Sequence, residues 1–239
     1  MTKPKGRRDV ESPLELATRL ALPFLDNPSR LTRALTHTSY LNENEDALDD
    51  NERLEFLGDA VLDFIVGAWL FDHRPEMREG ELTRARSALV RTEQLADFAR
   101  KVDLGRAMRL GKGEQRTGGY NRDALLCATF EAVIGAIYLQ ADLDAVQTFF
   151  NPMLDAYADE IIDAPEVIDY KSRLQEWTQA NNMGTPRYDT IEEKGPDHAK
   201  TFEIEVYINK EPYGRGHGKS KSAGAQLAAK SALDKLGIL

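Results

Sequence analysis

The sequence predicts an all-α domain followed by a small α+β domain with the order α-β-β-β-α. Between about 12 and 160, apolar residues recur with the helical period almost throughout, whereas TFEIEVYI at 201–208 alternates with the period of a strand. The stretch DAPEVIDY at 163–170 contains a proline and has neither period. The sequence therefore predicts a helical domain at 1–162, a linker at 163–168 and a second domain at 169–238.

Caps and turn residues divide the helical region. Ser12 precedes Pro13 as a plausible N-cap, and Ser29 and Asn51 could cap two further helices. The glycine-rich, basic stretch LGKGEQRTGGYNR at 110–122 indicates a loop. Helices are expected from about 13 and 29 onward, and over about 52–71, 79–89, 92–102, 123–140 and 143–162.

The pattern of apolar residues in the second domain predicts both helices and strands. KSRLQEWTQANN at 171–182 predicts a helix, and a Gly-Pro turn at 195–196 follows the first expected strand. A turn at 209–212 separates the second strand from a third near 212–217. The Ala-rich KSAGAQLAAKSALDKL at 221–236 predicts the closing helix.

Composition narrows the class of protein. The 239 residues are 41% hydrophobic, enough to form a core, with one cysteine, Cys127, which excludes an intrachain disulfide framework. The charged N-terminus lacks an apolar signal region, and no apolar run looks long enough to span a membrane. We therefore expect a cytoplasmic protein without a membrane partner.

The net charge of −9 is unevenly distributed. Residues 167–239 hold 11 Lys+Arg and 10 Asp+Glu, so the excess of acid falls on the preceding residues. A negative total therefore does not exclude a nucleic-acid-binding face on the second domain.

The stretch NERLEFLGDAVLDF at 51–64 places four acids in an otherwise apolar helix. With Glu52 set at zero, Glu55, Asp59 and Asp63 lie at about −60°, −20° and +20°, an arc of roughly 80°. Desolvated carboxylates this close repel one another, and a hard divalent cation such as Mg²⁺ would neutralise them. The alternative is a solvated polar stripe on an amphipathic helix.

NERLEFLGDAVL closely resembles the signature of the ribonuclease III family. ALTHTSY at 34–40, GELTRARSALV at 80–90 and FEAVIGAIYL at 130–139 fit the same family in order. The C-terminal α-β-β-β-α unit resembles the double-stranded-RNA-binding domain that follows the nuclease domain in bacterial members. The resemblance implies a Mg²⁺-dependent endoribonuclease of duplex RNA, with Mn²⁺ as a substitute, that processes rRNA and mRNA precursors.

The same resemblance assigns roles to individual residues. Glu55, Asp59 and Glu131 are expected to hold the metal, and Asp59, Glu131 and Glu52 to serve catalysis. Magnesium would activate a water and stabilise charge on the phosphate, with no protein nucleophile and no small-molecule cofactor. Family members are homodimers, which would cut both strands and place Phe56 at the interface. A simple core role for Phe56 is the alternative.

One position departs from the family pattern. The residue three before Glu131, normally an Asp on the same helix face, is Ala128. The chain could be a laboratory variant that traps uncut RNA, a natural member that uses three acids plus water, or a degenerate nuclease. The rival function is therefore a non-catalytic binder of double-stranded RNA.

Duplex RNA is recognised through phosphates and 2′-hydroxyls across successive minor grooves. By the same resemblance, Gln175 and Glu176 would reach 2′-hydroxyls, and His198 would contact RNA from the loop between the first two strands. Phosphates would meet a basic cluster at the start of the last helix. That cluster is Lys219, Ser220 and Lys221. The plain alternatives are a loop histidine and a solvated helix cap.

Overall fold

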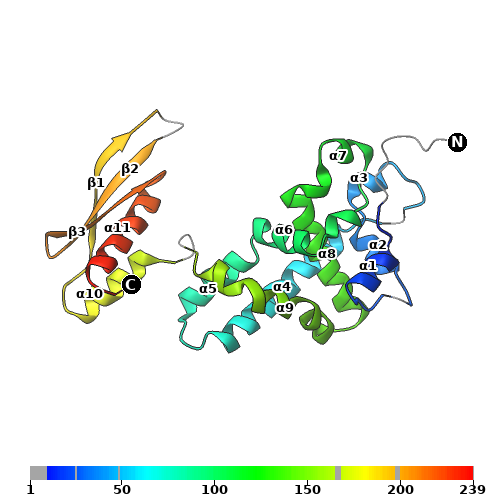
Figure 1. Cartoon of the computed structure of the whole chain (residues 1–239), viewed down its shortest axis with the longest axis horizontal. Coiled ribbons are helices and arrows are strands. Elements are labelled where there is room, and N and C mark those ends of the chain that lie inside the picture. The colour runs from blue at the N-terminus through cyan, green and yellow to red at the C-terminus, as the bar shows by residue number, and fades with distance from the viewer. Residues whose placement is uncertain (1–9, 25, 48, 165–167, 197–199, 239) are drawn as a thin grey trace. The chain divides into compact units, whose positions relative to one another are not determined.

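The computed structural model describes residues 10–24, 26–47, 49–164, 168–196 and 200–238. The chain forms two compact units, Met1–Val167 and Ile168–Leu239 (Figure 1). The first is helical, and the second combines helices with one sheet. Each is described by itself below.

The first unit begins with the helix that the sequence predicts after Ser12. Ser12 Oγ accepts a hydrogen bond from the Glu15 amide at 3.2 Å, and the Glu15 carboxylate accepts one from the Ser12 amide, which completes a capping box. The elements of this unit are α1 Pro13–Arg19, α2 Ser29–Ala34, α3 Thr38–Leu41, α4 Glu52–His73, α5 Glu79–Leu89, α6 Thr92–Lys101, η1 Leu104–Arg106, α7 Lys112–Arg116, η2 Gly119–Asn121, α8 Asp123–Gln140 and α9 Leu143–Ile162.

Local hydrogen bonds change some of the predicted boundaries. The stretch 110–122, predicted as a loop, contains the short helix α7 and the 3-10 turn η2. Ser29 begins α2 after Pro28 and does not cap it, and the Asn51 side chain makes no cap bond to α4. Short helical turns of this kind leave no periodic signal, because they cover fewer than two turns.

Helix α8 is the centre of the first unit. Its Phe130 ring lies 5.8 Å from that of Phe150 on α9 and 6.4 Å from that of Phe98 on α6, measured between centroids. Contrary to the sequence-based expectation, α8 is by length and composition apolar enough to cross a membrane, the one such helix in the described ranges. Ten of its residues are buried, so the apolar composition is that of a core helix packed on several sides.

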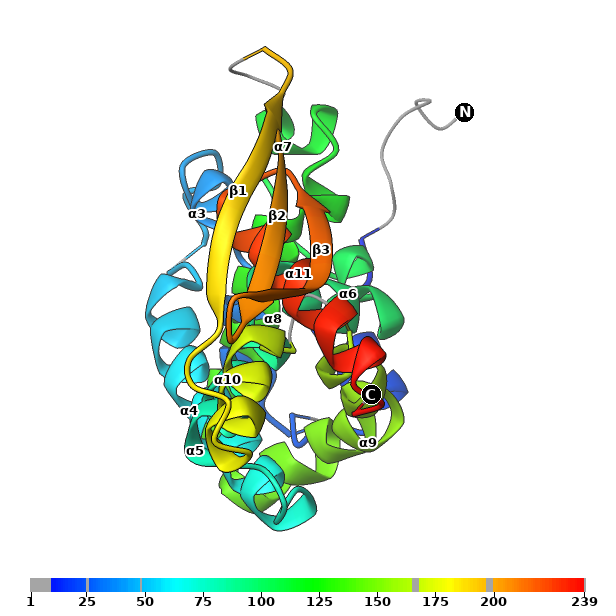
Figure 2. The ribbon, with the colours of Figure 1, turned by 90° about the vertical axis from the view of Figure 1, so that its left-hand side faces the viewer.

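In the second unit, three antiparallel strands pair in the order β1-β2-β3 (Figure 2). Ile204, Val206 and Ile208 of β2 face a core shared with the two helices. Glycines on β3 let α11 approach the sheet, because a Cβ at Gly216 would lie 2.3 Å from the Ala228 amide nitrogen. The elements are α10 Tyr170–Ala180, β1 Arg187–Lys194, β2 Thr201–Ile208, β3 Glu211–Gly218 and α11 Lys221–Lys235.

Candidate active site and RNA-binding face

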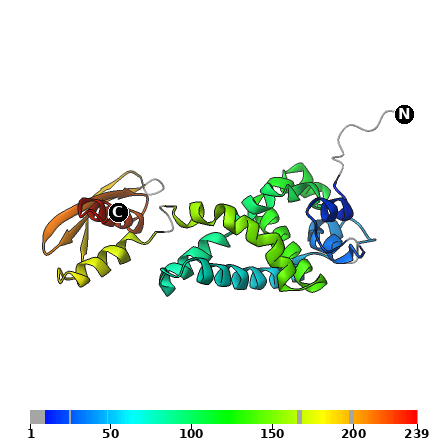
Figure 3. The same cartoon turned by 60° about the horizontal axis from the view of Figure 1, so that its bottom comes forward.

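Two glycines bring the backbones of α4 and α8 into direct contact. A Cβ on Gly58 of α4 would lie only 1.8 Å from the carbonyl oxygen of Glu131, and a Cβ on Gly135 of α8 would lie 2.4 Å from that of Leu54. Only hydrogen fits at either position. The close crossing sets Glu131 beside the acidic turn of α4. Figure 3 shows the helices of this unit from another side.

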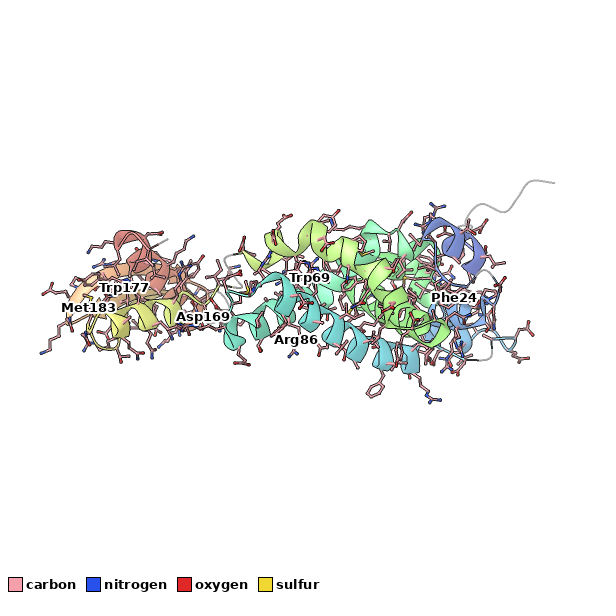
Figure 4. All side chains as sticks on the ribbon, turned by 90° about the horizontal axis from the view of Figure 1, so that it is seen from below. Phe24, Trp69, Arg86, Asp169, Trp177 and Met183 are labelled. Atoms are coloured by element: carbon pink, nitrogen blue, oxygen red, sulfur yellow. The ribbon has the colours of Figure 1, made fainter. Side chains whose placement is uncertain are left out.

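A pocket of about 430 Å³ opens at this crossing. The structure thus gathers all four acids named for the site around one space, although three come from α4 and one from α8. Asp63, the fourth member of the predicted acidic stripe, does not line the pocket: its carboxylate is 3.6 Å from the guanidinium of Arg86 on α5. Arg86 is labelled in Figure 4. The pocket is lined by Glu52, Glu55, Phe56, Asp59 and Glu131.

The surroundings of the pocket disfavour the charged form of two of its carboxylates. Burial, opposed by a hydrogen bond from Cys127 and reinforced by the charges of Asp59 and Glu55, raises the pKa of Glu131 to about 7. Burial, and then the charges of Glu52 and Asp59, also raise the pKa of Glu55. A carboxylate whose charged form is disfavoured in this way gains most from a cation in the pocket.

The thiol of Cys127 supports Glu131 from one helical turn away. Its Sγ donates to Glu131 Oε1 at 3.4 Å, and the side chain is buried. Burial and the neighbouring Glu131 raise the pKa of the Cys127 thiol to about 12, so it remains protonated and able to donate. Ala128, where the sequence resemblance leads us to expect an Asp, offers no donor or acceptor beyond its backbone.

The chemistry of these donors suits a hard divalent cation. Carboxylate oxygens are the ligands that Mg²⁺ takes, and Mg²⁺ keeps several of its waters. Among the described residues, no group of three or more Asp, Glu, His or Cys side chains is arranged so that it could hold a metal ion by itself. Few direct protein ligands are needed when water fills the remaining positions, so the acidic pocket fits Mg²⁺ as a partly hydrated ion.

Five of the six residues named for RNA binding are described, and all five are exposed on the second unit. Gln175 and Glu176 are exposed on α10, and Lys219 is exposed before α11. Ser220 is the N-cap of α11, where its hydroxyl accepts from the Ala223 amide at 3.1 Å. His198 lies outside the described residues.

Lys221 is exposed but already has a partner. Its ammonium lies 2.7 Å from the carboxylate of Glu193 on β1, a pairing that sequence reasoning did not find. The antiparallel register of β1 with β2 determines where the Glu193 side chain lies, and neither composition nor periodicity predicts that register. Lys221, one of the cations named for RNA binding, is therefore paired with an acid of its own domain.

Three phenylalanines on α4 face outward. Phe56, Phe64 and Phe71 are 81%, 60% and 72% exposed, the highest values among the large hydrophobic residues in the described ranges. Phe64 and Phe71 lie about 80° and 60° around the helix from Phe56, so the three share one face. We call Phe56, Phe64 and Phe71 the aromatic stripe; it borders the acidic pocket through Phe56.

Comparison with known proteins agrees with both units. Residues 27–156 match the family model described as Ribonuclease-III-like, and residues 170–236 match that of the double-stranded RNA binding motif. The chain is 47% identical over 225 residues to "Ribonuclease 3" of Roseiflexus sp. (strain RS-1), which covers 93% of this chain and 94% of the relative. It is 45% identical to "Ribonuclease 3" of Natranaerobius thermophilus over 97% of this chain and 98% of the relative.

A solved structure shows the same helical fold. The nuclease domain of ribonuclease III from Campylobacter jejuni superposes with a TM-score of 0.54 at 35% identity, over 59% of this chain and 94% of that one. The fold and the acidic pocket therefore define an endoribonuclease with a double-stranded-RNA-binding domain at its C-terminal side. The chain belongs to the ribonuclease III family.

Proposed function

We propose that the chain is a Mg²⁺-dependent endoribonuclease that cleaves double-stranded RNA at the acidic pocket. The observation that supports this most is the glycine-mediated crossing of α4 and α8, because it brings Glu131 to the acids of α4 around one pocket. Mn²⁺ would substitute for Mg²⁺, since both are hard cations that take oxygen ligands. The proposed domain boundaries are 1–162 for the nuclease and 169–238 for RNA binding, with a linker at 163–168.

Each acid has a proposed role. Glu55, Asp59 and Glu131 would hold Mg²⁺, which supplies an activated water and stabilises charge on the phosphate. Asp59 and Glu131 would also orient the attacking water from opposite helices, and Glu52 would assist from the exposed rim of the pocket. Cys127 keeps one oxygen of Glu131 occupied, so that the other is free to face the pocket.

A cleavage assay on long duplex RNA tests the proposal. We expect short products in Mg²⁺, none in EDTA, and none from Glu131→Gln, which keeps the shape of the side chain but removes the charge. The matched control is Glu160→Gln on α9, an exposed acid outside the acidic pocket, which should cleave as the parent does. Full activity of Glu131→Gln in Mg²⁺ would exclude this pocket as the site of cleavage.

The rival function, a non-catalytic binder of duplex RNA, is favoured by one residue, Ala128. It predicts a gel shift of duplex RNA without product at any Mg²⁺ concentration. We favour the enzyme because Glu55, Asp59 and Glu131 are all retained around the pocket. Clean products in the same assay would dismiss the rival.

The second unit would bind the duplex substrate through Gln175, Glu176, His198, Lys219, Ser220 and Lys221. Shape-selective contacts of this kind suit long RNA duplexes, such as those within rRNA and mRNA precursors in the cytoplasm. Competition binding separates this from general nucleic-acid affinity. Unlabelled duplex RNA should displace a labelled RNA duplex, and duplex DNA of the same sequence should do so poorly, because it lacks 2′-hydroxyls.

The aromatic stripe is the proposed homodimer interface. Its three exposed rings on one helix face give a row of large apolar side chains, which is unfavourable in water unless a partner covers it. A second copy would bring two pockets together, which fits cleavage of both strands with short 3′ overhangs.

Sedimentation velocity tests the homodimer. Phe64→Asp should convert the dimer to a monomer, because it places a charge in the centre of the stripe. The control is Leu227→Asp, which also places a charge at an exposed apolar residue, but on α11. It should leave the dimer intact. A dimer that survives Phe64→Asp together with Phe71→Asp would place the interface elsewhere.

A further inference from the structure

The ammonium of Lys221, at the start of α11, is held by the sheet. Its Nζ lies 2.7 Å from Glu193 Oε1 and 5.6 Å from the centroid of the Phe202 ring. Glu193 on β1 is paired directly with Phe202 on β2 in the antiparallel ladder. The backbone therefore fixes the Glu193 carboxylate at the position where it meets this lysine.

Glu193 contacts a second cation as well. Its other carboxylate oxygen lies 4.0 Å from Lys200 Nζ, at the end of the β1–β2 connection. One carboxylate thus contacts lysines from two of the three regions proposed to bind RNA, the β1–β2 connection and the start of α11.

The Glu193–Lys221 pair is exposed enough for a phosphate to replace it. The two side chains are 39% and 62% exposed, respectively. An exposed ion pair stabilises a protein only weakly, so a phosphate of an RNA duplex can replace the carboxylate as the partner of this lysine. When an RNA phosphate binds Lys221, the Glu193 carboxylate remains close to that phosphate and repels it.

We infer that Glu193 is an intramolecular competitor of RNA phosphates that lowers, and so sets, the affinity of the second unit for duplex RNA. The inference rests on the proposed RNA-binding role of Lys221. Glu193 itself is outside the set of residues named for RNA contact. Its effect acts through Lys221 and depends on charge, so it is strongest at low salt.

A purely structural role for Glu193 makes the opposite prediction. If the ion pair organised the start of α11, its loss would weaken RNA binding. The fold already fixes this segment in two other ways: Ser220 caps the helix, and a Cβ at Gly218 would lie 2.4 Å from the Gly224 amide nitrogen, so strand and helix are in backbone contact. The sign of the change in affinity therefore separates the two roles.

The test is a titration of full-length protein with an RNA duplex of about 20 base pairs, longer than the roughly 16 that such a domain spans. EDTA prevents cleavage. Glu193→Gln should bind about two- to fivefold more tightly than the parent at low salt, and the slope of log affinity against log salt should steepen by roughly one. The matched control is Glu192→Gln, the adjacent acid, whose partner is Lys194 at 2.8 Å; it should change affinity by less than half as much.

A double-mutant cycle with Lys221→Ala completes the test. Lys221→Ala should weaken binding, and Glu193→Gln should then have no more effect than Glu192→Gln. Unchanged or weaker binding by Glu193→Gln, while Lys221→Ala still weakens it, overturns the inference alone. If Lys221→Ala leaves affinity unchanged in a protein with the parent's melting temperature, the proposed RNA face fails and the inference fails with it.

Discussion

Ala128 is the residue at which the resemblance to the ribonuclease III family leads us to expect an Asp. It lies three residues before Glu131 on α8, so a carboxylate there would point to the same side of the helix. The remaining donors come from Glu55, Asp59 and Glu131, supported by the Cys127 thiol. One hard ligand fewer should weaken metal binding more than RNA binding, because the RNA face lies in the other unit.

Restoring the carboxylate tests this directly. Ala128→Asp should bind Mn²⁺ about tenfold more tightly and cleave duplex RNA faster when Mg²⁺ is limiting, since even residues that only orient metal ligands typically change metal affinity by about 10–100-fold. Ala128→Asn adds a side chain of the same size without charge and should recover much less. Titrations of Mn²⁺ followed by electron paramagnetic resonance measure the affinities. No gain from Ala128→Asp would argue against the site.

Cys127 offers a second test at the same scale. Cys127→Ala removes the donor to Glu131 and should weaken Mn²⁺ binding several-fold, by the roughly 1 kcal/mol of a typical hydrogen bond. Cys127→Ser keeps a donor and should restore most of it. Val133→Ala, a buried truncation on α8, controls for packing. Equal losses in Cys127→Ala and Cys127→Ser would mean that the sulfur packs and does not orient Glu131.

At the scale of single residues, the sequence predicted which acids share a helix face but not what they meet. The spacing of Glu52, Glu55 and Asp59 follows from the helical period. Asp63 has the same spacing, yet it faces Arg86, because α5 packs against that part of α4. Partners of this kind depend on tertiary contacts that period alone does not contain.

At the scale of elements, the crossing of α4 and α8 depends on Gly58. Gly58→Ala forces a Cβ against the Glu131 backbone, so the helices must separate; we expect a loss of about 1–3 kcal/mol in the free energy of unfolding and loss of Mn²⁺ binding. Gly67→Ala, on the same helix, has only the Arg86 Cδ atom at 4.0 Å and should be neutral or stabilising by about 0.5–1 kcal/mol. Thermal and chemical denaturation measure both variants. If Gly58→Ala and Gly67→Ala changed the free energy of unfolding equally, the crossing would not be tight.

The sheet of the second unit provides a pH-dependent prediction. A hydrogen bond from Tyr207, and then one from Arg215 at 2.7 Å, lower the pKa of Glu205. Its ionised form therefore stabilises the fold above the ordinary pKa of glutamate, and this contribution is lost as pH falls through the lowered pKa.

Thermal melts at two pH values check that sign. Glu205→Gln should lower the melting temperature of the second unit at pH 7, and the difference from the parent should shrink toward pH 3. Glu211→Gln, an exposed acid at the start of β3, is the control and should show little difference at either pH. A deficit of Glu205→Gln that grows on acidification would contradict the account.

Element identity was the most predictable level of the fold, and element ends the least. Long periodic segments such as α8 and alternating β2 were predicted over their observed residues. The helix α7 was missed, since its five residues leave no period. The aromatic stripe was also missed beyond Phe56, because α4 is apolar on most of its circumference and period does not say which apolar face is buried.

For the whole molecule, the two units should separate cleavage from binding. Glu131→Gln should retain duplex-RNA affinity within about twofold, because the change lies in the first unit. Lys221→Ala should raise KM for duplex RNA with little change in kcat. Filter binding and single-turnover kinetics measure both. A parallel loss of affinity and cleavage in both variants would mean that the units do not act separately.

The order of the two units could be predicted from sequence, because their periodicities differ on the two sides of 163–170. The fold classes were confirmed by the structure and by the family models. The gathering of acids at one pocket could be inferred only by resemblance, since it requires the Gly58–Gly135 crossing of helices that are distant in sequence.

The central claim is that acids from α4 and α8 jointly hold a divalent cation. Anomalous diffraction from a crystal soaked in Mn²⁺ tests it most directly. The account predicts one Mn²⁺ site in the acidic pocket, bound by carboxylate oxygens of Glu55, Asp59 or Glu131 together with waters. A well-ordered crystal with Mn²⁺ bound elsewhere and none in this pocket would contradict it.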